Sequence, residues 1–342
     1  MVQNIGDTLY RFYFCILLVG WLLVGCGEAG GQSPATAPGG ALALPSLGPA
    51  ELDGGQLQVV ATTSIIGDVV GNVGGEVIEL TTLMGPGQDP HSYEPSASDL
   101  TVVAGADVVF VNGWNLEEGL VDDLVEIAEG AAFVPVNAGV EPLAADAEDE
   151  DHEADEGAHV GVDPHTWLDP HVVRQWVTNI EETLSRLDPA HAEVYKGNAE
   201  AYLVQLDALI AHYDEQVARI PEGKRRLVTT HATLAYFAER YDFEVVGTVL
   251  PAGSTVAEPS AAGLAQLVEA MEAAGVCAIF TETTTSDQLA QALAGEIEGC
   301  ESVEMLSLYT DALDPVGSGA ETYIGMMLHN IELIVEGLSV TG

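Results

Sequence analysis

The sequence predicts an α/β protein in which two parallel-sheet lobes are joined by one long rigid helix. The first supporting observation is the segment 188–221, whose apolar residues recur at steps of three and four, as on one face of a helix. Asp188 and Pro189 predict the start of this helix, and Pro221 predicts its end. About 30 helical residues rise about 45 Å, which is enough to join two lobes. The predicted buried face consists of Tyr195, Ala199, Tyr202, Leu206, Leu209, Tyr213, Val217 and Ile220.

The second observation is that the segments on either side of this helix resemble each other. In each half, a strand ending in Thr-Thr is followed by a helix, a second strand, a loop rich in glycine and proline, and a helix that opens with Glu-Pro-Ser-Ala. This motif occupies residues 94–97 in the first half and 258–261 in the second. We therefore expect two α/β units of the same kind, an N-terminal lobe at 57–187 and a C-terminal lobe at 222–342.

Residues 1–25 have the pattern of an export signal. Arg11 precedes an apolar run of about thirteen residues, which is too short to cross a bilayer of about 30 Å as a helix. The run ends Leu-Val-Gly-Cys, which resembles the lipobox of bacterial lipoproteins. We expect Cys26 to be lipidated and the protein to be anchored on the outer face of the cell membrane or in the periplasm. An ordinary signal peptide with a chance cysteine is the alternative.

Two segments are predicted to be disordered. Residues 26–56 are rich in glycine, alanine, proline and serine without apolar periodicity, so they are predicted to be a flexible tether. The acidic loop 141–160 holds nine carboxylates and two histidines, His152 and His159, and no basic residue. It is either a solvated insertion or an accessory, weaker metal-collecting segment whose deletion should leave a tight site intact.

The acidic charge of the chain disfavours anionic partners. The formal net charge is −45, with only nine lysines and arginines, so nucleic acid and anionic lipid surfaces are poor partners and cations are attracted. Acidic surfaces also keep proteins soluble in salty surroundings.

Beyond the signal and its lipobox, the cysteines are Cys277 and Cys300, and such a pair in an exported protein favours a disulfide.

Side chains able to bind metals follow several predicted strands. They are His91, a few residues after VIELTTL, His231 after LVTT, Glu282 after VCAIFT, and Asp311 after VEMLSLYT. Ligands of open α/β sheets bind outside the carboxyl ends of the strands, so we expect these side chains to converge between the lobes. His165 lies in GVDPHTWLDPH, where two prolines and a tryptophan predict a fixed loop.

Three histidines and one aspartate, two from each half, make the ligand set of a four-coordinate transition-metal site. Taken singly, each histidine is more often an ordinary loop residue, and the aspartate a helix cap. We find no supported Ser-His-Asp or Cys-His arrangement, no Walker phosphate loop and no HExxH motif. Four protein ligands leave no open position for a reactive water, so we expect binding and delivery rather than catalysis.

These motifs together resemble the zinc and manganese substrate-binding lipoproteins of metal ABC importers. The resemblance spans about residues 58–338 and rests on VVATTSIIGDVV, LMGPGQDPHSYEPSASDL, ADVVFVNGWNLEEGL, DPHTWLDP, TTHATLAYFAERY and DALDPVGSGAETYIGMMLHNIELIVEGL. It implies that metal is held between two lobes by His91, His165, His231 and Asp311. It also implies a monomer that delivers metal to the permease and ATPase subunits of an importer.

The ligand set decides the expected metal. Three imidazoles and one carboxylate favour Zn(II) over Mn(II), which prefers more oxygen donors. Manganese members of the family commonly have a carboxylate as third ligand, so His231→Glu should shift relative affinity toward Mn(II). Many members carry an acidic or amide residue after this ligand, where the chain has Ala232, and Glu282 is the candidate to support the site or to replace a ligand. Zinc affinity should fall as the pH drops through about 6, because imidazole binds metal only when neutral.

Three alternatives remain open at this stage. The first is a Mn(II) receptor of the same family. The second is a hydrolytic or chelatase-type metalloenzyme on a similar bilobal frame, which would need a vacant coordination position beside a general base. The third is a surface adhesin. It would be recognised by variants that lose binding to the host surface without losing metal uptake. Metal analysis of protein purified without added metal separates the first alternative from the zinc receptor.

Overall fold

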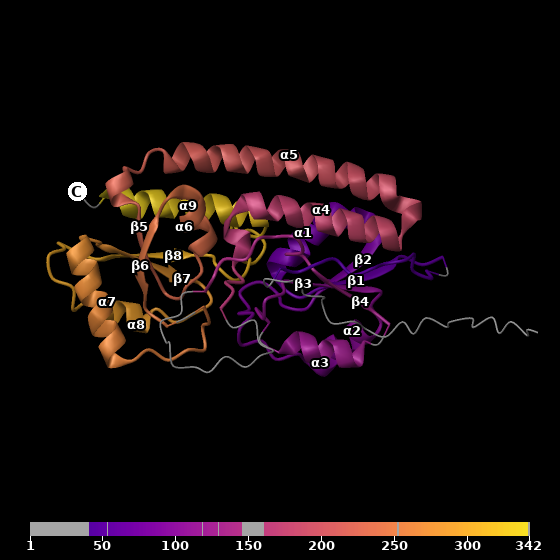
Figure 1. Ribbon diagram of the computed structural model, residues 1–342, viewed down its shortest axis with the longest axis horizontal. Helices are drawn as coiled ribbons and strands as arrows, with labels where there is room; N and C mark the ends of the chain where they lie inside the picture. The colour runs from indigo at the N-terminus through magenta and orange to yellow at the C-terminus, as the bar shows by residue number, and fades with distance from the viewer. Residues whose placement is uncertain are drawn as a thin grey trace, which may run out of the picture.

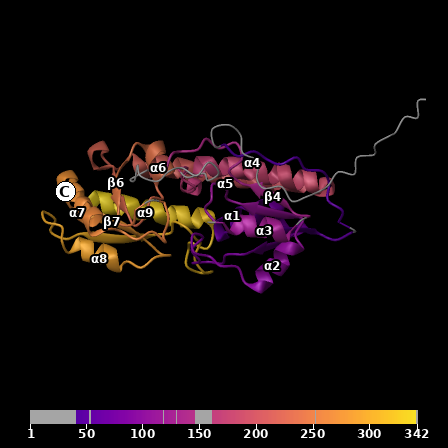
Figure 2. The ribbon, with the colours of Figure 1, turned by 60° about the horizontal axis from the view of Figure 1, so that its bottom comes forward.

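The computed structural model describes residues 41–340, apart from 53, 118, 129, 146–160 and 252. Within these residues the chain forms two lobes, each built on a four-stranded parallel sheet, and helix α5 (Ala192–Val217) runs across both (Figure 1). Figure 2 shows the lobes end to end along the length of α5. The predicted fold class, with two parallel-sheet α/β lobes, is confirmed.

The two lobes have the same strand order. The N-terminal lobe contains β1 (Leu57–Ala61), α1 (Ser64–Gly74), β2 (Ile78–Thr82), α2 (Ala97–Ala104), β3 (Val108–Val111), α3 (Leu120–Ile127), β4 (Ala132–Pro135) and α4 (Pro170–Leu187). The C-terminal lobe contains β5 (Arg226–Thr229), α6 (Ala235–Tyr241), β6 (Glu244–Thr248), α7 (Ala261–Ala274), β7 (Ala278–Glu282), α8 (Gln288–Ala294), β8 (Glu304–Leu308) and α9 (Tyr323–Val340). The orders β2-β1-β3-β4 and β6-β5-β7-β8 match, so the repeat in the sequence is a repeat of topology.

The Glu-Pro-Ser-Ala motifs start equivalent helices. Ser96 caps α2 by accepting a hydrogen bond from the amide of Asp99, whose side chain accepts one in return from the Ser96 amide. Ser260 caps α7 by accepting from the amide of Gly263. In both cases the proline sets extended backbone before the cap, so each helix starts at the same point of its lobe.

Both faces of each sheet are buried, as parallel strands require. In β3, Val108 and Phe110 belong to the core on the α5 side, whereas Val109 and Val111 belong to a separate core that includes α3. The core on the α5 side is continuous from one lobe to the other, because one face of α5 packs on α1 and α4 at one end and on α9 at the other. All eight residues of the predicted face of the linking helix are buried.

The start of the linking helix was predicted wrongly. The α-helix begins at Ala192 and has 26 residues, a rise of about 39 Å, and it follows a 3₁₀ turn at Pro189–His191. Asp188 does not cap it. Instead, Asp188 ends α4, and its carboxylate accepts hydrogen bonds from Tyr195 Oη and His191 Nδ1. Proline disfavours helical backbone in the residue before it, which separates α4 from α5 at this point.

The predicted tether, residues 26–56, is wrong for the part that the structure describes. Leu42 is buried in a small cluster with Trp114 and Val140, and the amide of Ala50 donates to the carbonyl of Leu187 at 2.8 Å. Irregularly spaced leucines in this segment pack on the folded chain without forming a helix or strand, which is why periodicity did not reveal them. Residues 26–40, with the lipidation candidate Cys26, lie outside the described part.

The predicted disulfide is confirmed. Cys277 directly precedes β7, and Cys300 lies shortly before the neighbouring parallel strand β8, with 5.8 Å between their Cα atoms. This spacing lies within the range that a disulfide requires. Within the described residues, none of the helices combines the length and hydropathy that a transmembrane span requires.

Candidate metal centre

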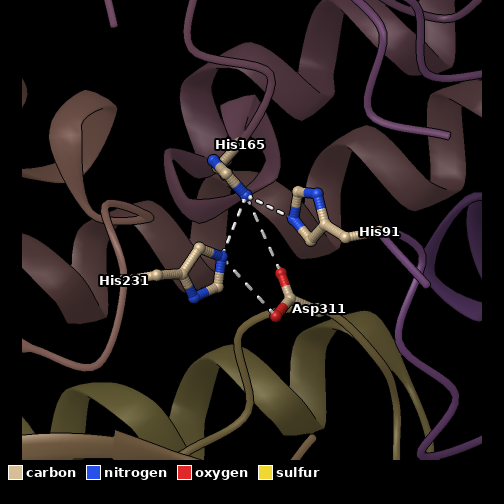
Figure 3. A group of neighbouring side chains, drawn as sticks. All are labelled: His91, His165, His231 and Asp311. Atoms are coloured by element: carbon tan, nitrogen blue, oxygen red, sulfur yellow. Dashed lines mark hydrogen bonds and ion pairs between the residues drawn. The ribbon is translucent and has the colours of Figure 1, made fainter. Parts of the chain in front are cut away.

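The four predicted ligands meet between the lobes. His91 follows β2, His231 follows β5 after one residue, and Asp311 follows β8. His165 comes from the loop before the 3₁₀ turn Thr166–Leu168. All four side chains point toward one another (Figure 3) and are buried. The strand ends therefore converge as the topology predicts.

Their donor atoms are spaced as they would be around one ion. His165 Nε2 lies 3.2 Å from His91 Nε2 and 3.3 Å from His231 Nε2. Two nitrogens bound to one tetrahedral Zn(II) at 2.0–2.1 Å would be about 3.3 Å apart. The carboxylate oxygens of Asp311 are 3.9 Å from His165 Nε2 and from His231 Nε2, and one ligand atom from each residue lies within 4.8 Å of the others.

Carboxylates on the far side orient two of the imidazole rings. His165 Nδ1 lies 2.8 Å from Asp163 Oδ1, and His231 Nδ1 lies 2.6 Å from Glu282 Oε2. Each carboxylate holds a proton on Nδ1, so that in the neutral ring the Nε2 lone pair is directed at the centre of the site. Two such lone pairs about 3.3 Å apart repel each other unless a cation or a proton lies between them.

The site is electrostatically prepared for a cation. Burial lowers the pKa of His165, so its ring stays neutral. Burial would also lower the pKa of His231, but the charges of Glu282 and Asp311 outweigh it and raise this pKa to about 9. Burial would raise the pKa of Asp311, but the three histidines outweigh it and lower the value. The carboxylate of Asp311 is therefore ionised.

The two oxygens of Asp311 differ. Oδ2 accepts hydrogen bonds from the hydroxyls of Thr284 and Thr310, each at 3.2 Å. Oδ1 is buried and has no hydrogen bond among the described residues. A buried charged oxygen without a hydrogen-bond donor is costly, and a metal ion is the partner that such an oxygen usually has. The carboxylate thus offers one oxygen to the centre.

Glu282 lies behind His231 and not at the centre. Its two oxygens contact the Nδ1 and the backbone amide of His231, the latter at 3.2 Å, so its position fits the supporting role rather than that of an alternative ligand. The loop histidines His152 and His159 lie outside the described residues.

Asp163 is a functional candidate that the sequence reasoning missed. The signal was present, because Asp-Pro-His occurs three times, ending at His91, His165 and His171. In each triplet the aspartate accepts the amide of the histidine two residues on, at 2.8 to 2.9 Å. This turn fixes the backbone of the histidine. In the His165 triplet the same oxygen also holds the ring.

The lobes are hydrogen-bonded to each other around the site. The amide of Gly87 donates to the carbonyl of Leu313 at 2.9 Å, and the amide of Leu313 donates to Ser64 Oγ at 3.0 Å. On another side, Thr255 Oγ1 donates to Asp89 Oδ2 at 2.6 Å. The loops that carry His91 and Asp311 are therefore tied to the opposite lobe.

The sequence matches the family described as zinc-uptake complex component A, periplasmic, over residues 59–337. The chain belongs to this family. Manganese-binding lipoprotein MntA of Halalkalibacterium halodurans is 34% identical over 330 residues, which are 96% of this chain and 98% of MntA. Zinc-binding protein TroA of Treponema pallidum is 30% identical over 331 residues, 96% of this chain and 98% of TroA. The manganese ABC transporter substrate-binding lipoprotein PsaA of Streptococcus pneumoniae is 30% identical over 292 residues, 84% of this chain and 90% of PsaA.

A solved structure agrees with the family assignment. The structure of the periplasmic zinc-binding protein TroA superimposes with a TM-score of 0.74 at 30% identity, and covers 83% of this chain and 99% of TroA. As a member of the zinc-uptake complex component A family, the chain is a metal-binding receptor of ABC importers that works outside the cytoplasm, and not an enzyme.

Proposed function

We propose that this protein captures Zn(II) outside the cytoplasm and delivers it to the permease and ATPase subunits of an ABC importer. His91, His165, His231 and Asp311 bind the ion. The observation that carries this proposal is the donor set: the Nε2 atom of His165 lies 3.2 Å and 3.3 Å from those of His91 and His231, and one carboxylate oxygen of Asp311 has no hydrogen bond among the described residues. Four donors, three of them nitrogen, suit four-coordinate zinc better than Mn(II).

Mn(II) is the second candidate, and the names of two relatives, MntA and PsaA, favour it. Mn(II) prefers more oxygen donors than this set supplies. It would need the second oxygen of Asp311, which Thr284 and Thr310 engage by hydrogen bonds. TroA is named a zinc-binding protein, and it is 30% identical to this chain, as PsaA is. The name of TroA therefore supports zinc as much as the name of PsaA supports manganese.

Metal competition tests the proposal. Metal-free protein is titrated with Zn(II) in the presence of Mn(II), and both are measured by elemental analysis after dialysis. We expect zinc to be retained, and His231→Ala to weaken zinc binding by at least tenfold. His171→Ala is the matched control, because it removes a histidine from the same Asp-Pro-His motif outside the cluster. Preferential retention of manganese, or equal zinc binding by His231→Ala and the parent, contradicts the proposal.

We also propose that the mature protein is a monomer held to the membrane by lipid on Cys26. Metabolic labelling with a fatty-acid analogue tests the lipid, since Cys26→Ser should lose the label and release the protein.

The acidic loop 141–160, with His152 and His159, is proposed to collect metal weakly, because ordering a flexible segment opposes binding. Its deletion should therefore leave the tight binding event in calorimetry unchanged, and loss of that event refutes an accessory role.

A further inference from the structure

Trp167 connects the loops that carry two of the metal-binding residues. It lies two residues after His165, in the 3₁₀ turn Thr166–Leu168, and is 2% exposed. Its indole Nε1 donates to the backbone carbonyl of Thr310 at 2.5 Å. Thr310 directly precedes Asp311 and belongs to the opposite lobe. One hydrogen bond therefore joins the His165 loop to the Asp311 loop.

Two further contacts fix Trp167, one at its ring and one at its backbone. Its ring packs against the ring of His165, with the centroids 5.3 Å apart and the planes at 64°. Its backbone carbonyl accepts a hydrogen bond from Tyr323 Oη at 2.7 Å, and Tyr323 is the first residue of α9 in the C-terminal lobe. The residue is thus held from both lobes and touches a metal-binding ring directly.

The carbonyl that Trp167 holds determines the direction of Asp311. A peptide unit is planar, so fixing the carbonyl oxygen of Thr310 also fixes the N–H and the Cα of the next residue. The carboxylate of Asp311 is attached to that Cα through one methylene group. Its Oδ1 lies 3.9 Å from His165 Nε2, somewhat beyond the separation of about 3.3 Å for two ligands of one tetrahedral ion. A small rotation of this peptide plane would move Asp311 Oδ1 too far from His165 Nε2 for both atoms to bind one ion.

We propose that Trp167 is a positioning residue for the metal site, which sets the carboxylate of Asp311 against the imidazole of His165 across the lobe boundary. The inference rests on the proposed function, since it concerns the same site. Trp167 itself binds no metal. It acts through the Thr310–Asp311 peptide and through the ring of His165.

The test compares two tryptophan variants. Trp167→Phe removes the Nε1 donor of Trp167, and Trp176→Phe removes an equally buried donor whose partner is Asn137 Oδ1 at 2.6 Å, within the N-terminal lobe. Both variants leave similar cavities, so both should lower the melting temperature of the metal-free protein. Only Trp167→Phe should weaken Zn(II) binding, by about tenfold, as is usual when a group that orients a metal ligand is lost.

A spectroscopic readout separates positioning from simple destabilisation. Co(II) is bound in place of zinc, and the intensity of its visible absorption reports the coordination geometry. We expect Trp167→Phe to change this spectrum and Trp176→Phe to leave it as in the parent. Should Trp167→Phe fail to fold, 3-benzothienylalanine at position 167, which keeps the indole shape without the N–H, gives the same comparison.

The outcomes distinguish this inference from the proposed function. If the parent binds neither Zn(II) nor Co(II), the proposed function fails. If the parent binds both and the Trp167 variants show parental affinity and an unchanged Co(II) spectrum, the positioning role alone is refuted. Equal weakening by Trp167→Phe and Trp176→Phe refutes it as well, because the effect would then follow from lost packing.

Discussion

Thr284→Val should shift the metal preference of the site toward Mn(II). Thr284 Oγ1 donates to Asp311 Oδ2 at 3.2 Å, and valine has the same shape without the hydroxyl. A hydrogen bond to a charged acceptor contributes about 1.5–3 kcal/mol, and this bond is long, so the lower figure applies. Its loss leaves Oδ2 with the Thr310 hydroxyl as its remaining hydrogen-bond donor among the described residues, so one lone pair of this oxygen can serve as a further ligand, which Mn(II) uses better than zinc. About 1.5 kcal/mol corresponds to about a tenfold change in the ratio of the two affinities.

Competition dialysis at buffered free Zn(II) and Mn(II), followed by elemental analysis, measures this ratio. Thr283→Val is the matched control, since Thr283 is the preceding residue and its side chain is exposed. We expect the control to keep the parental ratio. An unchanged ratio in Thr284→Val, in protein that still binds zinc, refutes the argument that hydrogen bonding restricts Asp311 to one metal-binding oxygen.

Three further predictions concern the groups around the site and the second lobe. Asp163→Asn should weaken zinc binding by 10-fold to 100-fold in a direct titration, because His165 Nδ1 loses its charged partner. In the metal-free protein, the pKa of His231 is raised to about 9 from an unfolded value near 6.5, so its stabilisation is complete below about pH 6.5 and is lost as the pH rises to about 9. Melting curves recorded in chelator at a series of pH values should show a loss of up to about 3 kcal/mol in the free energy of unfolding. The pH dependence should be flatter for His231→Gln, and identical pH dependence in the variant and the parent contradicts the prediction. Reducing the Cys277–Cys300 bridge, which spans 23 residues, should lower the free energy of unfolding by about 3 kcal/mol in denaturant titrations with and without reductant.

The sequence predicted the lobes and the site for different physical reasons. The lobes follow from periodicity, since α5 keeps one apolar face over 26 residues and the strands are short apolar runs. The convergence of His91, His231 and Asp311 follows from topology, because the carboxyl ends of parallel strands meet at one edge. The prolines and Trp167 around His165 predicted only a fixed loop, and its place with the other three was implied by the family resemblance of DPHTWLDP.

Other features depend on contacts that no local pattern encodes. The packing of Leu42 on Trp114 joins residues far apart in the chain, in a segment with neither helical nor strand periodicity. The start of α5 was misjudged because Asp188 and Pro189 also suit a 3₁₀ turn. The role of Asp163 needs a ring orientation, which only the folded loop provides.

Burial of the four proposed ligands implies that metal exchange depends on protein motion. His91 is 6% exposed, and His165, His231 and Asp311 are at most 1% exposed, so an ion bound by them has no direct route to solvent. The hydrogen bonds from Gly87 to Leu313 and from Leu313 to Ser64 tie the lobes together, and a separation of the lobes at this point would break them. Unloading by way of the lobe boundary can therefore be no faster than the separation of the lobes, whichever metal is bound. The rate of release is then set by the surface of the partner protein that separates the two lobes. Once that surface has bound, high metal affinity need not slow delivery.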